Sequence, residues 1–469
     1  MKLRGLLLLS LLAVAASLSA GTGRMIIISN DLQGVGLNDP TPATPIAGNN
    51  GTTLGQQRRN VLELAAQRWT TLLDTNVDIR VRTSFVSMDC DDTGVVLAAA
   101  NSVTWSANFA NAPRQNVWYP AALANRFAGT DLTPNDADIF VQFNLEMDKP
   151  ACRGDRGWYY GLNVDEGNDE SLLTVALHEI GHGLGMSGRG VDFFQNRPTV
   201  YDLHMLDLTA GRTWDQLTLE QRRVSSTNTG KLVWNGANVT AKAAQLLRRP
   251  PVLTVGVKNY DLGTASFGPS LALASMSGRV VPAVDANNEE GPSTTDGCTQ
   301  YDNAADVAGK ISLVDRGTCT FVQKALIAQA AGAVGLVIID NRKEANCINV
   351  PPAMSGSDPA VHIPVMSVTQ DDGAELRGQA TANAVNGLLR LDPSRMAGAS
   401  AEGYLRLYAP CTFSPGSSLY HWDTTASPNL LMEPFISGDL LDSVDISIYQ
   451  MMDLGWTQWP RTGRRVLRR

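Results

Sequence analysis

Hydrophobic and polar positions in the first half of the chain follow the periods of strands and helices. Residues 77–88 (VDIRVRTSFVSM) and 137–144 (ADIFVQFN) alternate with the two-residue period of a half-buried strand, and 24–30 (RMIIISN) reads as a third strand. In 54–73 (LGQQRRNVLELAAQRWTTLL) apolar residues recur at helical spacing. These segments predict a twisted sheet with a long helix packed on it.

A second helix is predicted for residues 171–186 (SLLTVALHEIGHGLGM), whose large apolar residues recur three and four positions apart. This apolar face indicates that the helix packs into the core. Asn168 or Ser171 would cap its start, and Gly183 and Gly185 would end it.

The pattern changes at about residue 250. Short β-like runs then surround one helix-like segment at 321–333; the runs are PVLTV, RVVPAV, KISLVD, GLVIID and IPVMSV. Strands that alternate with a helix indicate a separate α/β unit, which reaches to about residue 386. Between residues 401 and 456 the sequence pattern again resembles that of the chain before residue 250.

The chain has 469 residues, 43% of them hydrophobic, which is too long for one ordinary domain. Residues 1–20 have a basic start at Lys2 and Arg4, a short apolar stretch and a small-residue end, as in a secretory signal peptide. The apolar stretch is short for a membrane anchor, and no later segment is apolar enough to span a bilayer. We therefore expect a soluble protein that is secreted or exported to the periplasm.

The formal net charge is −8, and the basic residues of the signal and of the tail (461–469, RTGRRVLRR) hide a more acidic body. An acidic body argues against a nucleic-acid partner. The tail is expected to be a solvated end.

Six cysteines in an exported chain indicate disulfides. None has the CxxC spacing of a cysteine zinc site. Six cysteines allow fifteen pairings. Proximity favours the pairs Cys90–Cys152 and Cys298–Cys319, which leaves Cys347 and Cys411.

The segment ALHEIGHGLGMSG (176–188) contains His178, Glu179 and His182 in the HExxH arrangement. Residues four apart lie on one face of a helix, so the two imidazoles can hold one Zn²⁺. Glu179 lies one position round, where it reaches a zinc-bound water rather than the ion. The ion lowers the pKa of that water, and Glu179 takes its proton and passes it to the leaving nitrogen.

The same residues resemble the metzincin family of zinc proteases, in which HExxHxxG is followed closely by a third ligand. Gly185 matches the family's glycine, but Gly188 occupies the place of the ligand. From the residues alone, the third ligand is His204 or His421, with Asp192 and Asp202 as further alternatives; His362 lies in the separate α/β unit.

Residues 416–435 (GSSLYHWDTTASPNLLMEPF) resemble the region around the third zinc histidine of leishmanolysin-like metalloproteases. The resemblance implies that His421 completes the zinc site and that Met432 lies in the turn below it. Residues 443–456 (SVDISIYQMMDLGW) resemble the closing helix of that family.

Residues 309–341, followed by HIPVMSVTQDDGAEL, resemble the protease-associated (PA) domain, a non-catalytic module of secreted or luminal proteases and receptors. If the three histidines meet, the material between them forms an insert. The expected fold class is α+β, with a metzincin-like zinc protease domain split into 21–249 and 394–460 by an α/β PA domain at 250–393.

The function that these features imply is that of an exported zinc endopeptidase acting on protein or peptide substrates, with Glu179 as the catalytic base. Two alternatives remain: a catalytically inactive protein-binding module on the same scaffold, and a zinc hydrolase of non-peptide substrates. The strand at 137–144 is expected to be an edge strand that holds extended peptide. The aromatic residues of 158–162 (WYYGL) either line a cleft or belong to the core.

Overall fold

The computed structural model describes residues 23–458, apart from 92–93, 155, 272–275, 343–349, 437–439 and 441–442. The signal peptide predicted at 1–20 and the basic tail at 461–469 lie outside these residues. Contacts divide the chain into two compact units, one formed by residues up to 185 together with those from 455 onward, the other by residues 186–454.

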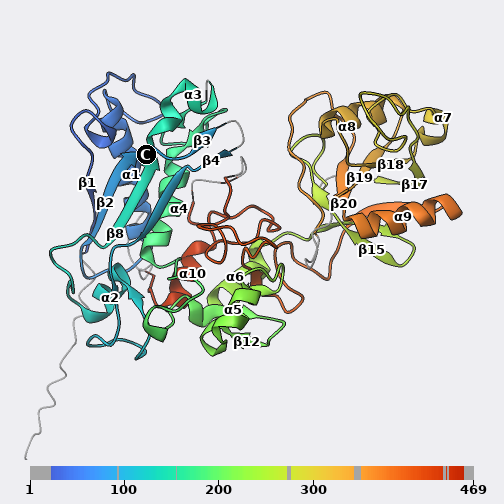
Figure 1. Cartoon of the computed structure of the whole chain (residues 1–469). Coiled ribbons are helices and arrows are strands. Elements are labelled where there is room, and N and C mark those ends of the chain that lie inside the picture. Colours follow the sequence, from blue (N-terminus) through green and yellow to red (C-terminus); the bar gives the residue numbers. More distant parts are fainter. Residues whose placement is uncertain are drawn as a thin grey trace, which may run out of the picture. The chain divides into compact units, whose positions relative to one another are not determined.

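The first unit is built on a four-stranded sheet, as the alternating segments predict (Figure 1). Its strands are, in spatial order, β1 (Met25–Ser29), β2 (Ile79–Val86), β8 (Ile139–Asn144) and β5 (Ala98–Ser102). β1, β2 and β8 run parallel, and β5 is antiparallel to β8. The long helix α1 (Leu54–Leu72) is confirmed, and the Thr53 hydroxyl caps it by accepting a hydrogen bond from the Gln56 amide.

The expectation that 137–144 forms an edge strand is wrong. β8 is paired on both sides, with β2 and with β5, so its main chain has no open side for a peptide. The small residues of β5 (AAANS) lack the apolar alternation that marks a strand, which is why the sequence did not reveal the strand that covers β8.

The helix that carries the HExxH motif is α4 (Leu172–Leu184). Ser171 caps it by accepting from the Thr174 amide, and Gly185 ends it with φ of 136°, a conformation that favours glycine. Gly183, predicted to end the helix, is still helical. Two indole groups anchor this helix, because Trp69 and Trp456 donate from Nε1 to the carbonyl oxygens of Leu177 and Leu184.

The second unit contains a small sheet of four antiparallel strands. These are, in spatial order, β12 (Arg212–Thr213), β11 (Met205–Asp207), β13 (Leu232–Trp234) and β22 (Leu405–Arg406). Three helices accompany it: α5 (Leu219–Ser225), α6 (Ala237–Leu246) and α10 (Ser447–Leu454). The Asp453 carboxylate joins α10 to the start of α6 by accepting from Trp234 Nε1 and the Asn238 amide.

The same unit contains an eight-stranded mixed sheet that spans residues 251–391, within the predicted insert. Its strands are, in spatial order, β15 (Lys258–Asp261), β14 (Pro251–Val255), β21 (Asn386–Leu391), β17 (Met276–Pro282), β18 (Ile311–Asp315), β19 (Gly335–Ile339), β20 (Val365–Val368) and β16 (Gly263–Thr264). β17 to β20 form its parallel centre.

Two helices cover opposite faces of this larger sheet. Leu336 and Ile338 of β19 share a hydrophobic cluster with α8 (Phe321–Ala330), whereas Val337 and Ile339 share another with α9 (Gln370–Ala382). Because successive side chains of a strand point to opposite faces, the two helices lie on different sides. α8 was predicted and α9 was not.

The remaining elements of the described residues are short. They are β3 (Cys90–Asp91), β4 (Gly94–Val95), β6 (Trp105–Ser106), β7 (Tyr119–Pro120), α2 (Ala121–Ala128), α3 (Pro150–Arg153), β9 (Trp158–Tyr159), β10 (Glu170–Ser171) and α7 (Ala304–Val307).

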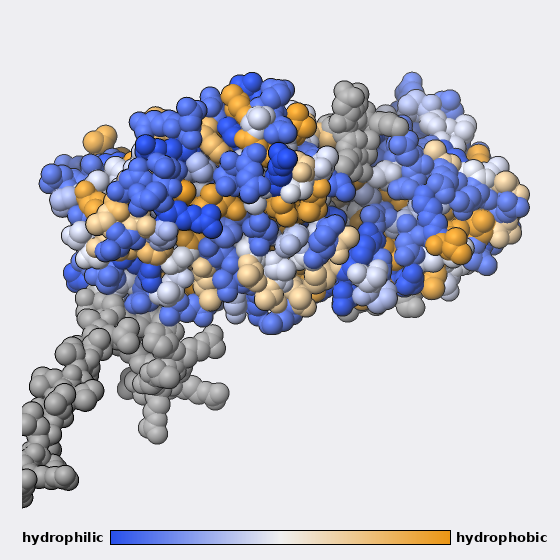
Figure 2. Space-filling view, turned by 90° about the horizontal axis from the view of Figure 1, so that it is seen from below, coloured by the Kyte–Doolittle hydropathy of each residue, from blue (hydrophilic) through white to orange (hydrophobic). Residues whose placement is uncertain are grey.

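The predicted disulfides Cys90–Cys152 and Cys298–Cys319 are both present. Cys347 lies outside the described residues. Within the described part of the chain, no helix combines the length and the hydropathy needed to cross a bilayer. Hydrophilic residues predominate on the face shown in Figure 2, where hydrophobic residues form small separate groups.

Close packing of α4 on β8 depends on Gly183. A Cβ atom at this position would lie 2.2 Å from Cγ2 of Ile139, which is fully buried. We expect Gly183→Ala to lower the free energy of unfolding by about 1–3 kcal/mol, measured by denaturant unfolding. Gly378→Ala is the matched control, because it lies in α9 with open space at its Cβ and is expected to be neutral or slightly stabilising. Equal stability of the Gly183→Ala and unmodified proteins would contradict this packing.

Candidate metal centre

Helix α4 places two imidazoles side by side. His178 and His182 lie one turn apart, and their Nε2 atoms are 3.0 Å apart. His182 is buried and His178 half-buried. At this distance, two protonated ring nitrogens would repel each other. The pair can therefore share one proton or bind one cation.

His421 lies in the loop that follows β22 and is buried. Its Nδ1 is 2.7 Å from the carbonyl oxygen of Ser417. A carbonyl only accepts, so Nδ1 carries the proton and the lone pair is on Nε2, the tautomer that a metal ligand requires. The main chain on both sides is fixed, because the Tyr408 amide donates to the His421 carbonyl and the Trp422 amide to that of Met432.

One ring nitrogen each from His178, His182 and His421 lies within 4.8 Å of the others. Among the described residues this is the one group of three histidine, cysteine or acidic side chains arranged to hold a metal ion. The other candidates for a third ligand do not join it. His204 stacks on the Trp234 ring at 5.0 Å, and the Asp202 carboxylate accepts from the amide and hydroxyl of Thr199.

Glu179 is buried beside the two histidines of α4, and its Oε2 has no hydrogen-bond partner. Burial raises the pKa of this carboxyl to about 8. A cation near the carboxylate would lower that pKa again, because opposite charges favour the ionised form. An unpartnered buried carboxylate next to converging imidazoles therefore fits a bound cation together with a polar ligand such as water.

Tyr420 explains why the expected ligand position next to the helix is a glycine. A Cβ atom at Gly188 would lie 2.6 Å from Cε1 of the Tyr420 ring. The Tyr420 hydroxyl accepts a hydrogen bond of 2.7 Å from the Gly190 amide, and the side chain is half-buried. No side chain longer than that of glycine fits at position 188 while Tyr420 occupies this space.

Sequence reasoning did not identify two groups that hold His421. A sequence pattern could not identify the main-chain carbonyl of Ser417 as the partner of His421, because every residue has a main-chain carbonyl. Tyr420 sits next to the histidine in the sequence, but its contact with Gly188 and Gly190 spans more than 200 residues and has no sequence signal.

Met432, which the resemblance assigns to the turn, and Trp422, next to His421, are both buried, at 1% and 0% exposure. Gly185 closes α4. The aromatic residues of 158–162 belong to the core, since Trp158, Tyr159 and Tyr160 are buried, and Trp158 Nε1 donates to the Asn144 carbonyl.

Residues 276–376 match the family model described as "PA domain", which confirms the resemblance of the insert. Together with the mixed helices and strands of both units, this makes the chain a mixed α/β protein with a PA domain.

Several relatives are named as aminopeptidases. The chain is 28% identical over 148 residues to "Probable leucine aminopeptidase 2" of Aspergillus fumigatus, covering 32% of this chain and 26% of that protein. It is 40% identical over 103 residues to "Aminopeptidase" of Pseudomonas aeruginosa, covering 21% and 18%. The chain therefore spans about a quarter or less of the length of these curated relatives.

Among solved structures, the zinc aminopeptidase BSAP from Bacillus subtilis aligns at 22% identity and a TM-score of 0.23, covering 33% of this chain and 36% of that chain. A TM-score this low gives no evidence about the fold of this chain. None of these three is named as a metzincin or a leishmanolysin-like protease, so that finer assignment remains a proposal.

The contact between Gly188 and Tyr420 can be tested by adding one methyl group. We expect Gly188→Ala to lower the free energy of unfolding by about 1–3 kcal/mol, because the half-buried Tyr420 ring must move to admit the Cβ atom. Gly157→Ala is the control, since its Cβ would make only an ordinary contact of 3.5 Å with the Met147 carbonyl oxygen. If thermal unfolding shows Gly188→Ala to be as stable as Gly157→Ala, Tyr420 does not fill this position.

Proposed function

We propose that this chain is a zinc-dependent endopeptidase of the metzincin type. The observation that carries the proposal is the convergence of three imidazole nitrogens beside one unpartnered buried carboxylate. The relatives named as aminopeptidases are in keeping with peptide-bond hydrolysis as the reaction class. Export rests on the predicted signal peptide.

The donor set fits zinc. Three neutral imidazoles with one open position are the ligands of a catalytic Zn²⁺, which accepts nitrogen ligands at about 2.0–2.1 Å. His421 has the tautomer that such binding needs. When bound, the ion supplies Lewis acidity that polarises the scissile carbonyl and acidifies water.

The residues of the chain perform the proton transfers. Glu179 lies one position round α4 from the ligand His178, and its free Oε2 is available to the attacking water. The carboxylate takes a proton from that water and later donates it to the nitrogen of the leaving amine. Its burial keeps bulk water away, so the proton stays with the reacting groups.

Assignment to the metzincin type, and to the leishmanolysin-like proteases within it, is supported by motif order. His421 follows the HExxH helix by more than 200 residues and precedes Met432, the arrangement expected for that family. The buried Met432 carbonyl accepts from the Trp422 amide, so the methionine segment packs directly against the segment of the third histidine.

Aminopeptidase activity is the second candidate, because it is the activity named for the aligned relatives. Those alignments cover 148 and 103 residues, a length comparable with the PA match and a minor part of each relative. A shared non-catalytic module is sufficient to explain them, so the position of cleavage must be measured.

Removal of the third ligand tests the metal centre. We expect His421→Ala to bind Zn²⁺ at least about 100-fold more weakly than the unmodified protein, as His178→Ala should, because the ion loses one of three ligands. Zinc content after dialysis and competition with a chelator measure this. His362→Ala, an exposed histidine of the insert, is the control. Full zinc content in His421→Ala would refute the three-histidine site.

The position of cleavage separates the candidate activities. We expect the zinc-loaded protein to cut an N-acetylated, C-amidated decapeptide internally, and Glu179→Gln to lower kcat at least about 100-fold. Mass spectrometry of the products gives the cut site. Stepwise removal of residues from free N-termini only would establish an aminopeptidase. Cleavage of sugar esters or amides alone would establish another hydrolase, and no chelator-sensitive cleavage at all would favour the binding module.

A further inference from the structure

The chain enters and leaves the insert through two neighbouring segments, residues 247–250 and 392–398, which we call the stem. Two main-chain hydrogen bonds of 2.9 Å join these segments, from the Asp392 amide to the Pro250 carbonyl and from the Ala397 amide to the Arg248 carbonyl. β14 and β21 continue the pairing into the sheet of the insert. The insert is therefore connected by one paired structure rather than by two independent tethers.

Side-chain contacts fix the returning segment of the stem to the insert. The buried Asp392 carboxylate accepts hydrogen bonds from the Ser394 amide at 3.0 Å and from Arg395 Nε at 2.9 Å. Arg395 also forms an ion pair of 2.5 Å with Asp261, the last residue of β15. The position of the stem is thus set by the sheet of the insert.

Both segments of the stem contact one loop, residues 423–428. The Arg248 amide donates a hydrogen bond of 2.7 Å to the Ser427 carbonyl oxygen. Gly398 is buried, and a Cβ atom at this position would lie 2.5 Å from Cα of Ala426. Its φ of 80° also belongs to the left-handed region that favours glycine. Packing this close leaves the loop no room to move toward the stem.

The contacted loop lies between His421 and Met432 in the sequence. Main-chain hydrogen bonds lead from the stem toward the histidine. The Arg406 amide donates to the Gly398 carbonyl at 2.8 Å, and the Asp423 amide donates to the Arg406 carbonyl at 3.0 Å. Asp423 is only two residues from His421. The stem therefore supports the segment of the candidate third ligand as well as the loop that follows it.

We propose that the stem positions His421 for metal binding, with Gly398 and the Arg248 amide as its positioning groups. The proposal rests on the proposed metal centre. Both groups act through the loop 423–428. Groups that orient a metal ligand typically change metal affinity by about 10–100-fold, because the ligand must be held within about 0.5 Å of its productive position. The insert thus contributes to the geometry of the site whose ligands it separates in the sequence.

Adding a methyl group at the contact tests the proposal. We expect Gly398→Ala to bind Zn²⁺ at least about tenfold more weakly than the unmodified full-length protein, because its Cβ atom displaces the loop and with it His421. The visible absorption bands of the Co²⁺-loaded protein should also shift, since they report the geometry of the ligands. Gly403→Ala is the matched control and should match the unmodified protein. Its φ of 88° imposes similar backbone strain, but its Cβ would lie 3.7 Å from Cε of Met396.

A second pair of variants leaves Gly398 unchanged and decides the matter if Gly398→Ala does not fold. Arg248→Pro removes the amide that donates to Ser427, and the preceding Leu247 is already extended, at φ −72° and ψ 138°, as a residue before proline should be. Arg248→Ala loses the same side chain but keeps the amide. We expect only Arg248→Pro to weaken Zn²⁺ binding, at least about fivefold. Equal Zn²⁺ affinity within both pairs of variants would overturn the proposal.

A measurement without metal separates this proposal from the proposed function. In the metal-free protein, hydrogen exchange measured by mass spectrometry should be at least about fivefold faster for the amides of residues 421–428 in Gly398→Ala and Arg248→Pro than in their controls. Faster exchange in a protein that binds no metal would refute the metal centre but support the role of the stem. Unchanged exchange would overturn that role, whatever the affinity for metal.

Discussion

The proposed site depends on one constraint, that ring nitrogens of three histidines from distant parts of the sequence lie within 4.8 Å of one another. A helix provides two of them at fixed spacing. The third comes from a loop, where nothing in the local backbone period fixes its direction, so hydrogen bonds must do so. The Ser417 carbonyl selects the tautomer of His421, and main-chain hydrogen bonds from Tyr408 and to Met432 hold the strand-like segment around it.

This arrangement is unfavourable without a cation. Lone pairs that converge repel one another, and the unpartnered Glu179 oxygen has lost its hydration without gaining a donor. Tightly packed surroundings prevent the groups from relaxing: Gly183 lets α4 approach β8, and indole donors fix two carbonyls of the same helix. The fold thus holds in place a set of groups whose electrostatic balance would improve with a bound cation, which is the usual sign of a functional site rather than of a stabilising one.

Periodicity in the sequence predicted the elements that bury a clear apolar stripe, including β2, β8, α1 and α4. It failed where tertiary contacts decide. β5 is a strand because β8 offers it a partner, and α9 has a polar sequence (QDDGAELRGQATA) with few core residues. In the site, HExxH is local and readable, and His421 came from a family resemblance. The Tyr420 ring that makes Gly188 necessary came from neither, because a contact over such a distance leaves no pattern in a single sequence.

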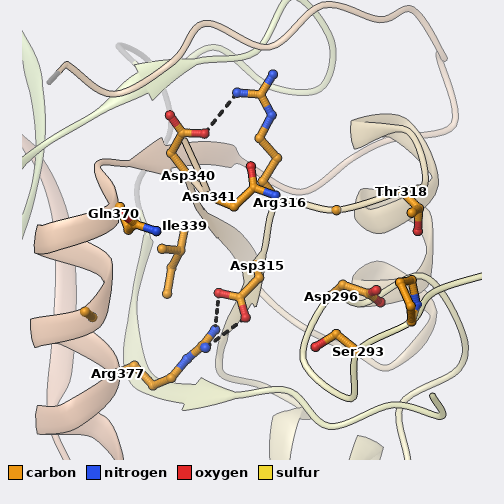
Figure 3. Close-up of a pocket in the computed structure, with 13 residues that line it drawn as sticks. Ser293, Asp296, Asp315, Arg316, Thr318, Ile339, Asp340, Asn341, Gln370 and Arg377 are labelled. Carbon is orange, nitrogen blue, oxygen red and sulfur yellow. Dashed lines mark hydrogen bonds and ion pairs between the residues drawn. The ribbon is translucent and has the colours of Figure 1, made fainter. Parts of the chain in front are cut away.

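The insert also contains a cavity of about 700 Å³, lined by residues at the ends of β18 and β19 and by residues of α9 (Figure 3), and its walls are held rigidly. The Cys298–Cys319 disulfide ties the segment that contains Asp296 to the segment after β18, and both segments line the cavity. Lys324 is fully buried and donates hydrogen bonds to the Asp296 carbonyl oxygen and to Cys298 Sγ. Burial lowers the pKa of this amino group, because it disfavours the charged form. Desolvation of the Lys324 ammonium group is unfavourable. Its hydrogen bonds offset part of this cost, and they hold the segment of Asp296 and Cys298 in one conformation. Since ordering a loop on binding opposes affinity, a lining that is fixed in advance lowers the entropic cost of binding any ligand there.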